Sequence, residues 1–175
     1  MAQYTLSRTI DDTDGPFTLP VNNFDLRPER GRSDLDRRQR FNFAGKFNLP
    51  WNMRAGAVLT FATGAPFNIT TGFDDNGDGT VNDRPLGVTR NTGRGPRLAQ
   101  VDLRFSRLFS IATPFKKRVR PGRDFRNLEI SLDLFNAFNH TNFADIIGVQ
   151  SSPRFGMSTR ALPARTLQLS GRYRF

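Results

Sequence analysis

The chain has 175 residues, a net charge of +10 and no cysteine. This length allows a single domain, and the lack of cysteine excludes disulfides, thiolate metal sites and a cysteine nucleophile. No apolar run is long enough for a transmembrane helix. A basic chain is often a nucleic-acid-binding protein, but the basic residues here alternate with apolar ones and form no long block of like charge.

Six segments alternate polar and apolar residues with a period of two, which predicts strands with one apolar and one polar face. In chain order they cover residues 3–10, 40–49, 52–62, 100–109, 127–135 and 166–175. Charged residues occupy the polar faces at mid-strand. They are Arg40, Lys46, Arg54, Asp102, Arg104, Glu129, Asp133, Arg172 and Arg174.

The connections between these segments alternate in length. Long polar stretches cover residues 11–37, 71–97 and 139–165, whereas Pro50-Trp51 is a tight turn and 110–126 is a moderate, basic connection. Soluble domains rarely contain three loops of that length, but a transmembrane barrel has long loops at one end and short turns at the other. We therefore predict an all-β fold: an antiparallel transmembrane β-barrel segment of about six strands in an up-and-down meander, with its long loops outside the cell.

Five stretches together resemble the C-terminal end of a TonB-dependent outer-membrane receptor of the Oar-like group. They are RQRFNFAGKFNLPW, GAVLTFATGAPFNITTGFDDNGDGTVNDRP, LAQVDLRFSRLF, LEISLDLFNAFNHTNF and GRYRF. The resemblance covers nearly everything after Asp36. It implies a large barrel, commonly of about twenty-two strands, with an N-terminal plug, a TonB-contacting segment and the import of large or scarce solutes across the bacterial outer membrane.

The resemblance also gives the alternating C-terminal end a role as the signal read by the barrel assembly machinery. The signal positions are Leu169, Gly171, Tyr173 and Phe175. Residues 1–175 are then expected to be the C-terminal part of a receptor barrel without its plug domain and signal peptide. The barrel is incomplete, since about eight strands are needed for closure. The expected partners are outer-membrane lipid, the barrel assembly machinery, the rest of the receptor and, through its plug, TonB, with no nucleic acid.

The stretch DDNGDGTVND at residues 74–83 matches part of a calcium-loop pattern. Oxygen ligands would come from positions one, three, five, seven and nine, which are Asp74, Asn76, Asp78, Thr80 and Asn82. Pro85 stands where a bidentate glutamate would complete the site. Two interpretations stay open: a weak Ca²⁺ site on an outside loop, or a loop in which Asp, Asn and Gly simply favour tight turns. No other cofactor is expected.

No arrangement of catalytic residues can be argued from the sequence. His140 is the single histidine and has no placed partner, so we expect no enzyme. Two alternatives to an import receptor stay open. One is an outer-membrane adhesion or surface-display barrel without transport, which the absence of a plug domain upstream would favour. The other is a soluble basic β-protein that binds nucleic acid, which salt-dependent DNA binding would favour.

Overall fold

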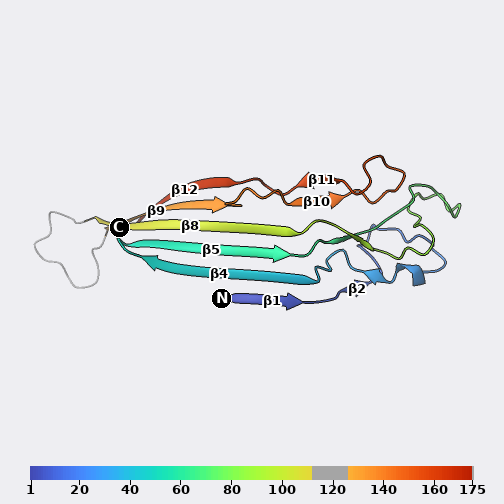
Figure 1. The fold of residues 1–175 in the computed structure, drawn as a ribbon, viewed down its shortest axis with the longest axis horizontal. Helices are drawn as coiled ribbons and strands as arrows, with labels where there is room; N and C mark the ends of the chain where they lie inside the picture. Colours follow the sequence, from blue (N-terminus) through green and yellow to red (C-terminus); the bar gives the residue numbers. More distant parts are fainter. Residues whose placement is uncertain (112–125, 175) are drawn as a thin grey trace, which may run out of the picture.

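The computed structural model describes residues 1–111 and 126–174, and its main feature is one long, open sheet (Figure 1). Six strands form the sheet in the order β1-β4-β5-β8-β9-β12, and every neighbouring pair is antiparallel. They are β1 (Ala2–Leu6), β4 (Gln39–Leu49), β5 (Met53–Ala62), β8 (Leu98–Ile111), β9 (Arg126–Phe135) and β12 (Thr166–Arg174). The predicted all-β antiparallel meander of six strands is confirmed.

The long connections at one end of the sheet contain several short elements (Figure 1). Three small antiparallel pairs join β2 (Ile10–Asp11) to β3 (Gly31–Arg32), β6 (Pro66–Phe67) to β7 (Gly93–Arg94), and β10 (Phe143–Ile146) to β11 (Ser158–Ala161). Among the residues that the structure describes, one 3-10 turn, η1, spans Arg27–Glu29. None of the described residues form a helix that is long and apolar enough to cross a membrane.

The first strand is shorter than the alternation predicts, because hydrogen bonds draw its second half into the following loop. β1 ends at Leu6, and the backbone N–H of Thr9 donates to Asp36 Oδ1 at 3.0 Å. The carbonyl of Thr9 accepts from the N–H of Ser33 at 3.1 Å. Ile10, predicted in the first strand, therefore belongs to β2.

The register of the sheet places most apolar side chains of the six strands on one face and most polar ones on the other. The exceptions include Arg107, which lies on the apolar face between Met53 and Ile130, and Val58, which lies opposite Asp102. On one face Phe105 of β8 lies between Ala55 and Leu132, and Leu132 lies opposite Leu169. On the other face a continuous row crosses five strands, and its members are Lys46, Gly56, Arg104, Asp133 and Gln168. The charged residues that the sequence predicts on one face do share it. We call the two sides the apolar face and the polar face.

The apolar face has no second layer packed on it. Among the described residues, the only buried hydrophobic one is Ala62, whereas Phe47 is 53% exposed and Leu169 is 75% exposed. Burial instead falls on polar residues of the loops and on two strand serines. They are Glu29, Ser33, Asp36, Asp83, Arg90, Asn91, Ser106, Ser131, Asn136 and Asn142. This distribution is the reverse of that in a water-soluble domain, whose apolar side chains gather in a core.

The connection between β4 and β5 is the predicted tight turn. Trp51 and Asn52 both have positive φ angles, 59° and 57°, as the central residues of a type I′ hairpin turn require. The N–H of Met53 donates to the carbonyl of Pro50 at 3.3 Å and closes the turn. The turn lies at the end of the sheet opposite the long loops (Figure 1).

Candidate functional site

Three long loops gather at one end of the sheet and form what we call the loop cluster (Figure 1). They cover residues 7–38, 63–97 and 136–165, between β1 and β4, β5 and β8, and β9 and β12. Loops usually run over a protein surface and position binding residues. Here the loops also pack on one another, so their contacts decide which side chains could form a site.

A buried ion pair joins the first loop to the second. Arg84 NH2 lies 2.6 Å from Glu29 Oε2, and the two side chains are only 7% and 5% exposed. The other atoms of the pair are also bonded. Glu29 Oε1 accepts from the N–H of Val21 at 3.0 Å, and Arg84 donates to Asn68 Oδ1 at 3.0 Å and to the carbonyl of Pro28 at 3.2 Å. Such complete bonding is what a buried charge needs to be tolerated.

A second junction between the same loops centres on Arg90 and Asn91, which are 1% and 2% exposed. Asn91 Nδ2 donates to Asp14 Oδ1 at 2.9 Å and to the carbonyl of Arg32 at 2.8 Å. Arg90 forms ion pairs with Asp11 and, at 2.9 Å, with Asp14. Burial raises the pKa of Asp14, although the hydrogen bond from Asn91 opposes this, and burial lowers the pKa of Arg90.

The third loop is held against the second by backbone contacts. Thr70 and Val149 form a parallel bridge, with the N–H of Thr70 donating to the carbonyl of Gly148 at 3.0 Å. A Cβ on Gly148 would collide with the carbonyl oxygen of Asn68. Only glycine allows the two backbones to approach this closely.

The asparagines of the FNAFNHTN stretch order the third loop. Asn142 is 2% exposed, and its amide pairs with the backbone of Ala99: Oδ1 accepts from the N–H at 2.8 Å and Nδ2 donates to the carbonyl at 2.9 Å. Asn136 Nδ2 donates to the carbonyls of His140 and Pro163 at 2.9 and 3.2 Å. These amides bond within the chain, so the stretch is a structural feature of the rim.

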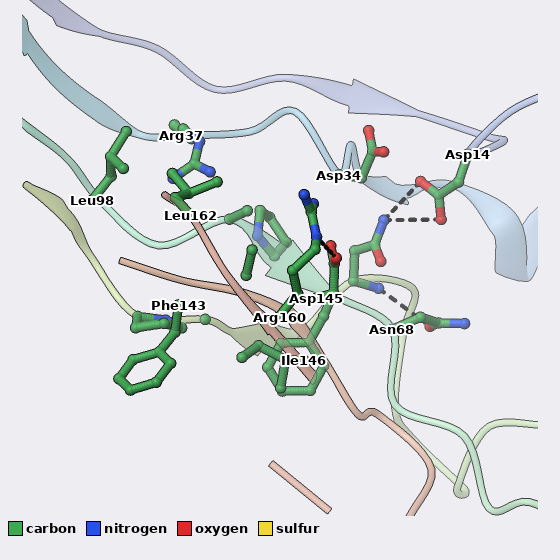
Figure 2. A pocket seen from close by; sticks show the side chains of 17 residues that line it. Asp14, Asp34, Arg37, Asn68, Leu98, Phe143, Asp145, Ile146, Arg160 and Leu162 are labelled. Atoms are coloured by element: carbon green, nitrogen blue, oxygen red, sulfur yellow. Dashed lines mark hydrogen bonds and ion pairs between the residues drawn. The ribbon is translucent and has the colours of Figure 1, made fainter. Parts of the chain in front are cut away.

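The three loops together enclose a cavity of about 480 Å³, which is the candidate site (Figure 2). Its polar wall includes Asp14, Asp34 and Arg37, and the ion-paired Asp145 and Arg160. Arg160 donates a hydrogen bond that lowers the pKa of Asp145. Burial, and secondarily the charge of Arg40, lowers the pKa of Arg37. Both signs of charge line the cavity, so it suits a polar ligand with hydrogen-bonding groups.

The predicted calcium stretch forms an exposed part of the second loop. Asp74 accepts the backbone N–H groups of Gly77, Asp78 and Gly79 at 2.7, 3.0 and 2.9 Å. Thr80 donates its hydroxyl to Asp78 and so lowers the pKa of that carboxyl group. These bonds are also the ones expected from a loop in which Asp, Asn and Gly favour tight turns, so they agree with the tight-turn interpretation.

Two asparagines connect this stretch to the first loop. Asn82 Nδ2 donates to the carbonyls of Leu19 and Pro20 at 3.1 and 3.0 Å, and Asn76 Nδ2 donates to that of Val21 at 2.6 Å. The described residues hold no group of three or more His, Cys, Asp or Glu side chains suited to a metal ion. Calcium binding therefore stays a prediction. Calorimetric binding at millimolar Ca²⁺ that Asp78→Asn removes would support it, and no heat with the unaltered chain would remove it.

Three of the four predicted assembly-signal residues are described and lie along β12. Leu169, Gly171 and Tyr173 share the apolar face, opposite Leu132, Ile130 and Leu128 of β9. Leu169 and Tyr173 are 75% and 47% exposed. The fourth residue, Phe175, and most of the predicted basic turn at 110–126 lie outside the described residues. The structure thus gives the signal a continuous, accessible apolar face and leaves its role a prediction.

Sequence reasoning misses the residues that lock the loop cluster. Glu29 and Arg84 are 55 positions apart, and Asn91 and Asp14 are 77 positions apart, so no short motif links them. The signal in the sequence is weaker: asparagine is enriched where the backbone takes a positive φ, and Asn91, in a long loop, does so with a φ of 56°.

Residues 1–89 match a protein-family model described as an outer membrane beta barrel domain. The matched segment contains β1, β4 and β5, the first long loop and most of the second. Comparisons with curated proteins and with solved structures gave no match.

Proposed function

The chain belongs to the outer membrane beta barrel domain family and lies in the outer membrane, and on that premise we propose that it forms part of the wall of a TonB-dependent import receptor. In this proposal the apolar face contacts lipid, the polar face lines the lumen, and the loop cluster lies outside the cell. The imported solute is large or scarce, and energy reaches the barrel from the inner membrane through TonB.

The observation that carries the proposal is the combination of a charged polar face with an interlocked loop cluster at one end of it. The face carries ionic groups at mid-strand, for example Arg104, whose NH1 lies 3.6 Å from Asp133 Oδ1. A wall of this kind suits a wide, water-filled lumen holding a plug. The cavity among the loops supplies a place where a polar solute could first be held.

The open edges of the sheet fit a larger barrel. In the described structure β1 pairs only with β4, and β12 pairs only with β9. Unpaired backbone groups are too costly in hydrocarbon for an open edge to face lipid, and six strands are too few to enclose a lumen. We propose that further strands of the receptor pair with both edges and that its plug packs against the polar face.

Uptake measurements in cells that produce the protein test the import function. We expect the protein to increase entry of its solute, and we expect that increase to disappear when TonB is deleted or the proton-motive force is dissipated. An unchanged increase in cells without TonB would contradict the proposal and indicate passive diffusion.

A second candidate function, surface adhesion or display, is favoured by one observation. Apolar side chains in the loop cluster stand free in solvent: Phe17, Phe24 and Leu86 are 97%, 101% and 105% exposed. Exposed aromatic groups commonly anchor protein contacts. Cell binding that is lost in Phe17→Ser and Phe24→Ser, together with no effect of the protein on solute entry, would favour this function over import.

We also propose that the C-terminal strand is read by the barrel assembly machinery through Leu169, Gly171, Tyr173 and Phe175. The support is the accessible apolar face of β12. Leu169→Ser should slow assembly into the outer membrane more than Gln168→Ser, which alters the polar face of the same strand. Equal assembly rates would contradict this role.

A further inference from the structure

Three cationic side chains surround one glycine on the polar face. Lys46 of β4, Gly56 of β5 and Arg104 of β8 lie directly opposite one another, and Arg54 lies two positions from Gly56 on the same face. Residues paired across strands are about 5 Å apart at Cβ, and diagonal neighbours are about 7–8 Å apart. We call Lys46, Arg54 and Arg104 the cationic cluster.

Gly56 leaves open space at the centre of the cationic cluster. A Cβ built on this residue would meet nothing nearer than the Cβ of Arg104, at 3.7 Å. A hollow of about 600 Å³ lies over this position, and its wall includes the whole cluster together with Asn48, Ser106 and one carboxylate, that of Glu129. This volume is within the range of small-molecule sites, roughly 300–1,000 Å³.

The charge of the cluster is poorly compensated. Arg104 lies 3.6 Å from Asp133, but neither Lys46 nor Arg54 forms a hydrogen bond or ion pair with another described residue. A carboxylate of the neighbouring strand, Asp102, already accepts the N–H of Asn136 at 2.8 Å and the side chain of Gln100 at 3.0 Å. In the wall of the hollow three cations stand against one carboxylate, that of Glu129, so the net charge there is positive.

We propose that the cationic cluster binds the anionic group, carboxylate or phosphate, of a small solute. Arginine offers a planar, two-pronged donor for such groups, and lysine adds a point charge with three N–H donors. The inference rests on the proposed import function, because the polar face meets passing solute only if it lines the lumen. The site is open to water, so binding is weakened by salt.

Calorimetry on the full-length protein, purified from the outer membrane in detergent, tests the inference with inorganic pyrophosphate as the probe and sucrose as the neutral control. We expect binding of pyrophosphate alone, weaker at high ionic strength. Lys46→Gln and Arg54→Gln should each weaken it about tenfold, since each removes a hydrogen bond between charged groups. Arg40→Gln removes the same charge from the same face, six residues along β4 from Lys46 and outside the wall of the hollow, and should leave affinity within about twofold of the unaltered protein.

A second pair of variants tests the geometry without changing charge. Gly56→Leu keeps all three cations and fills the space between them, so pyrophosphate binding should be lost. Gly56→Ala should bind like the unaltered protein, because its Cβ makes only an ordinary contact. Circular dichroism checks that each variant is folded.

The results separate this inference from the import proposal. One outcome is that pyrophosphate binding depends on the cluster but solute uptake does not depend on TonB. This outcome would overturn the transport proposal and support the anion site. No binding by the unaltered protein, or equal weakening by Lys46→Gln and Arg40→Gln, would overturn the anion site.

Discussion

Single residues explain why the loops hold together without an apolar core. Asn142 occupies the place of a strand neighbour for Ala99, because a side-chain amide carries the same donor and acceptor as a peptide group. Glu29 and Arg84 likewise satisfy each other, because each supplies the opposite charge that the other needs when it is buried. Each of these side chains is buried, and each depends on a partner far away in the sequence.

Removing one member of the buried ion pair should open the first loop. Arg84→Met leaves the Glu29 carboxylate buried without its cation, which typically costs about 3–5 kcal/mol. Limited proteolysis of the folded protein should show faster cleavage within residues 7–38. The double variant Glu29→Gln/Arg84→Met removes the isolated charge and should recover much of the resistance. Faster cleavage of the double variant than of Arg84→Met would contradict the role assigned to the pair.

Neighbouring residues of β9 should respond oppositely to substitution. Leu132→Arg places a charge on the apolar face, which costs about 2–4 kcal/mol at mid-bilayer, and should block membrane assembly of the full-length protein. Asp133→Asn alters the polar face and should assemble. Gln168→Arg is a matched control, because it introduces the same side chain on the polar face beside Asp133. Equal membrane insertion of Leu132→Arg and Asp133→Asn would contradict the assignment of the faces.

At the scale of elements, the β10–β11 hairpin contains an ion pair that should make it sensitive to acid. Arg160 lowers the pKa of Asp145 below its usual 3.8 in the folded chain. The contact therefore stabilises the hairpin fully above about pH 4 and loses its effect as pH falls through the lowered pKa. The hydrogen-exchange protection factors of residues 143–161, which correct for the intrinsic pH dependence of exchange, should fall only in that acidic window.

The variant Asp145→Asn serves as the control for this pH effect. Its side chain cannot ionise, so the hydrogen-exchange protection factors across the hairpin should lose the acid-dependent step and be about equal at pH 3 and pH 6. A step of the same size in Asp145→Asn would show that another group causes it.

The strands could be predicted from the sequence because their two faces meet different surroundings. Alternation such as Leu132-Asp133-Leu134 specifies which side each residue takes, and the pairing of β9 with β8 and β12 follows that pattern. The end of β1 could not be predicted in this way, because Asp36 and Ser33 draw Thr9 into the first loop. The candidate cavity could not be predicted from the sequence either, since its walls come from three loops whose contacts span tens of residues.

For the whole molecule, the central claim is that lipid covers the apolar face. A chain whose only buried hydrophobic residue, among those described, is Ala62 has no interior to hold it together in water. Most apolar side chains of its strands are spread over one side of the sheet, and the ion pairs of the described residues lie on the other side and in the loops. The membrane supplies the apolar surroundings that a core supplies in other proteins.

Labelling along β12 tests this claim most directly, and the absence of native cysteine makes single labels straightforward. Fluorophores are placed at Leu167→Cys, Gln168→Cys, Leu169→Cys and Ser170→Cys in the full-length protein in bilayers. We expect a quencher attached to lipid chains to act at 167 and 169, and aqueous iodide to act at 168 and 170. Quenching without this alternation, or a polypeptide that is monomeric, compact and cooperatively folded in plain buffer, would contradict the account.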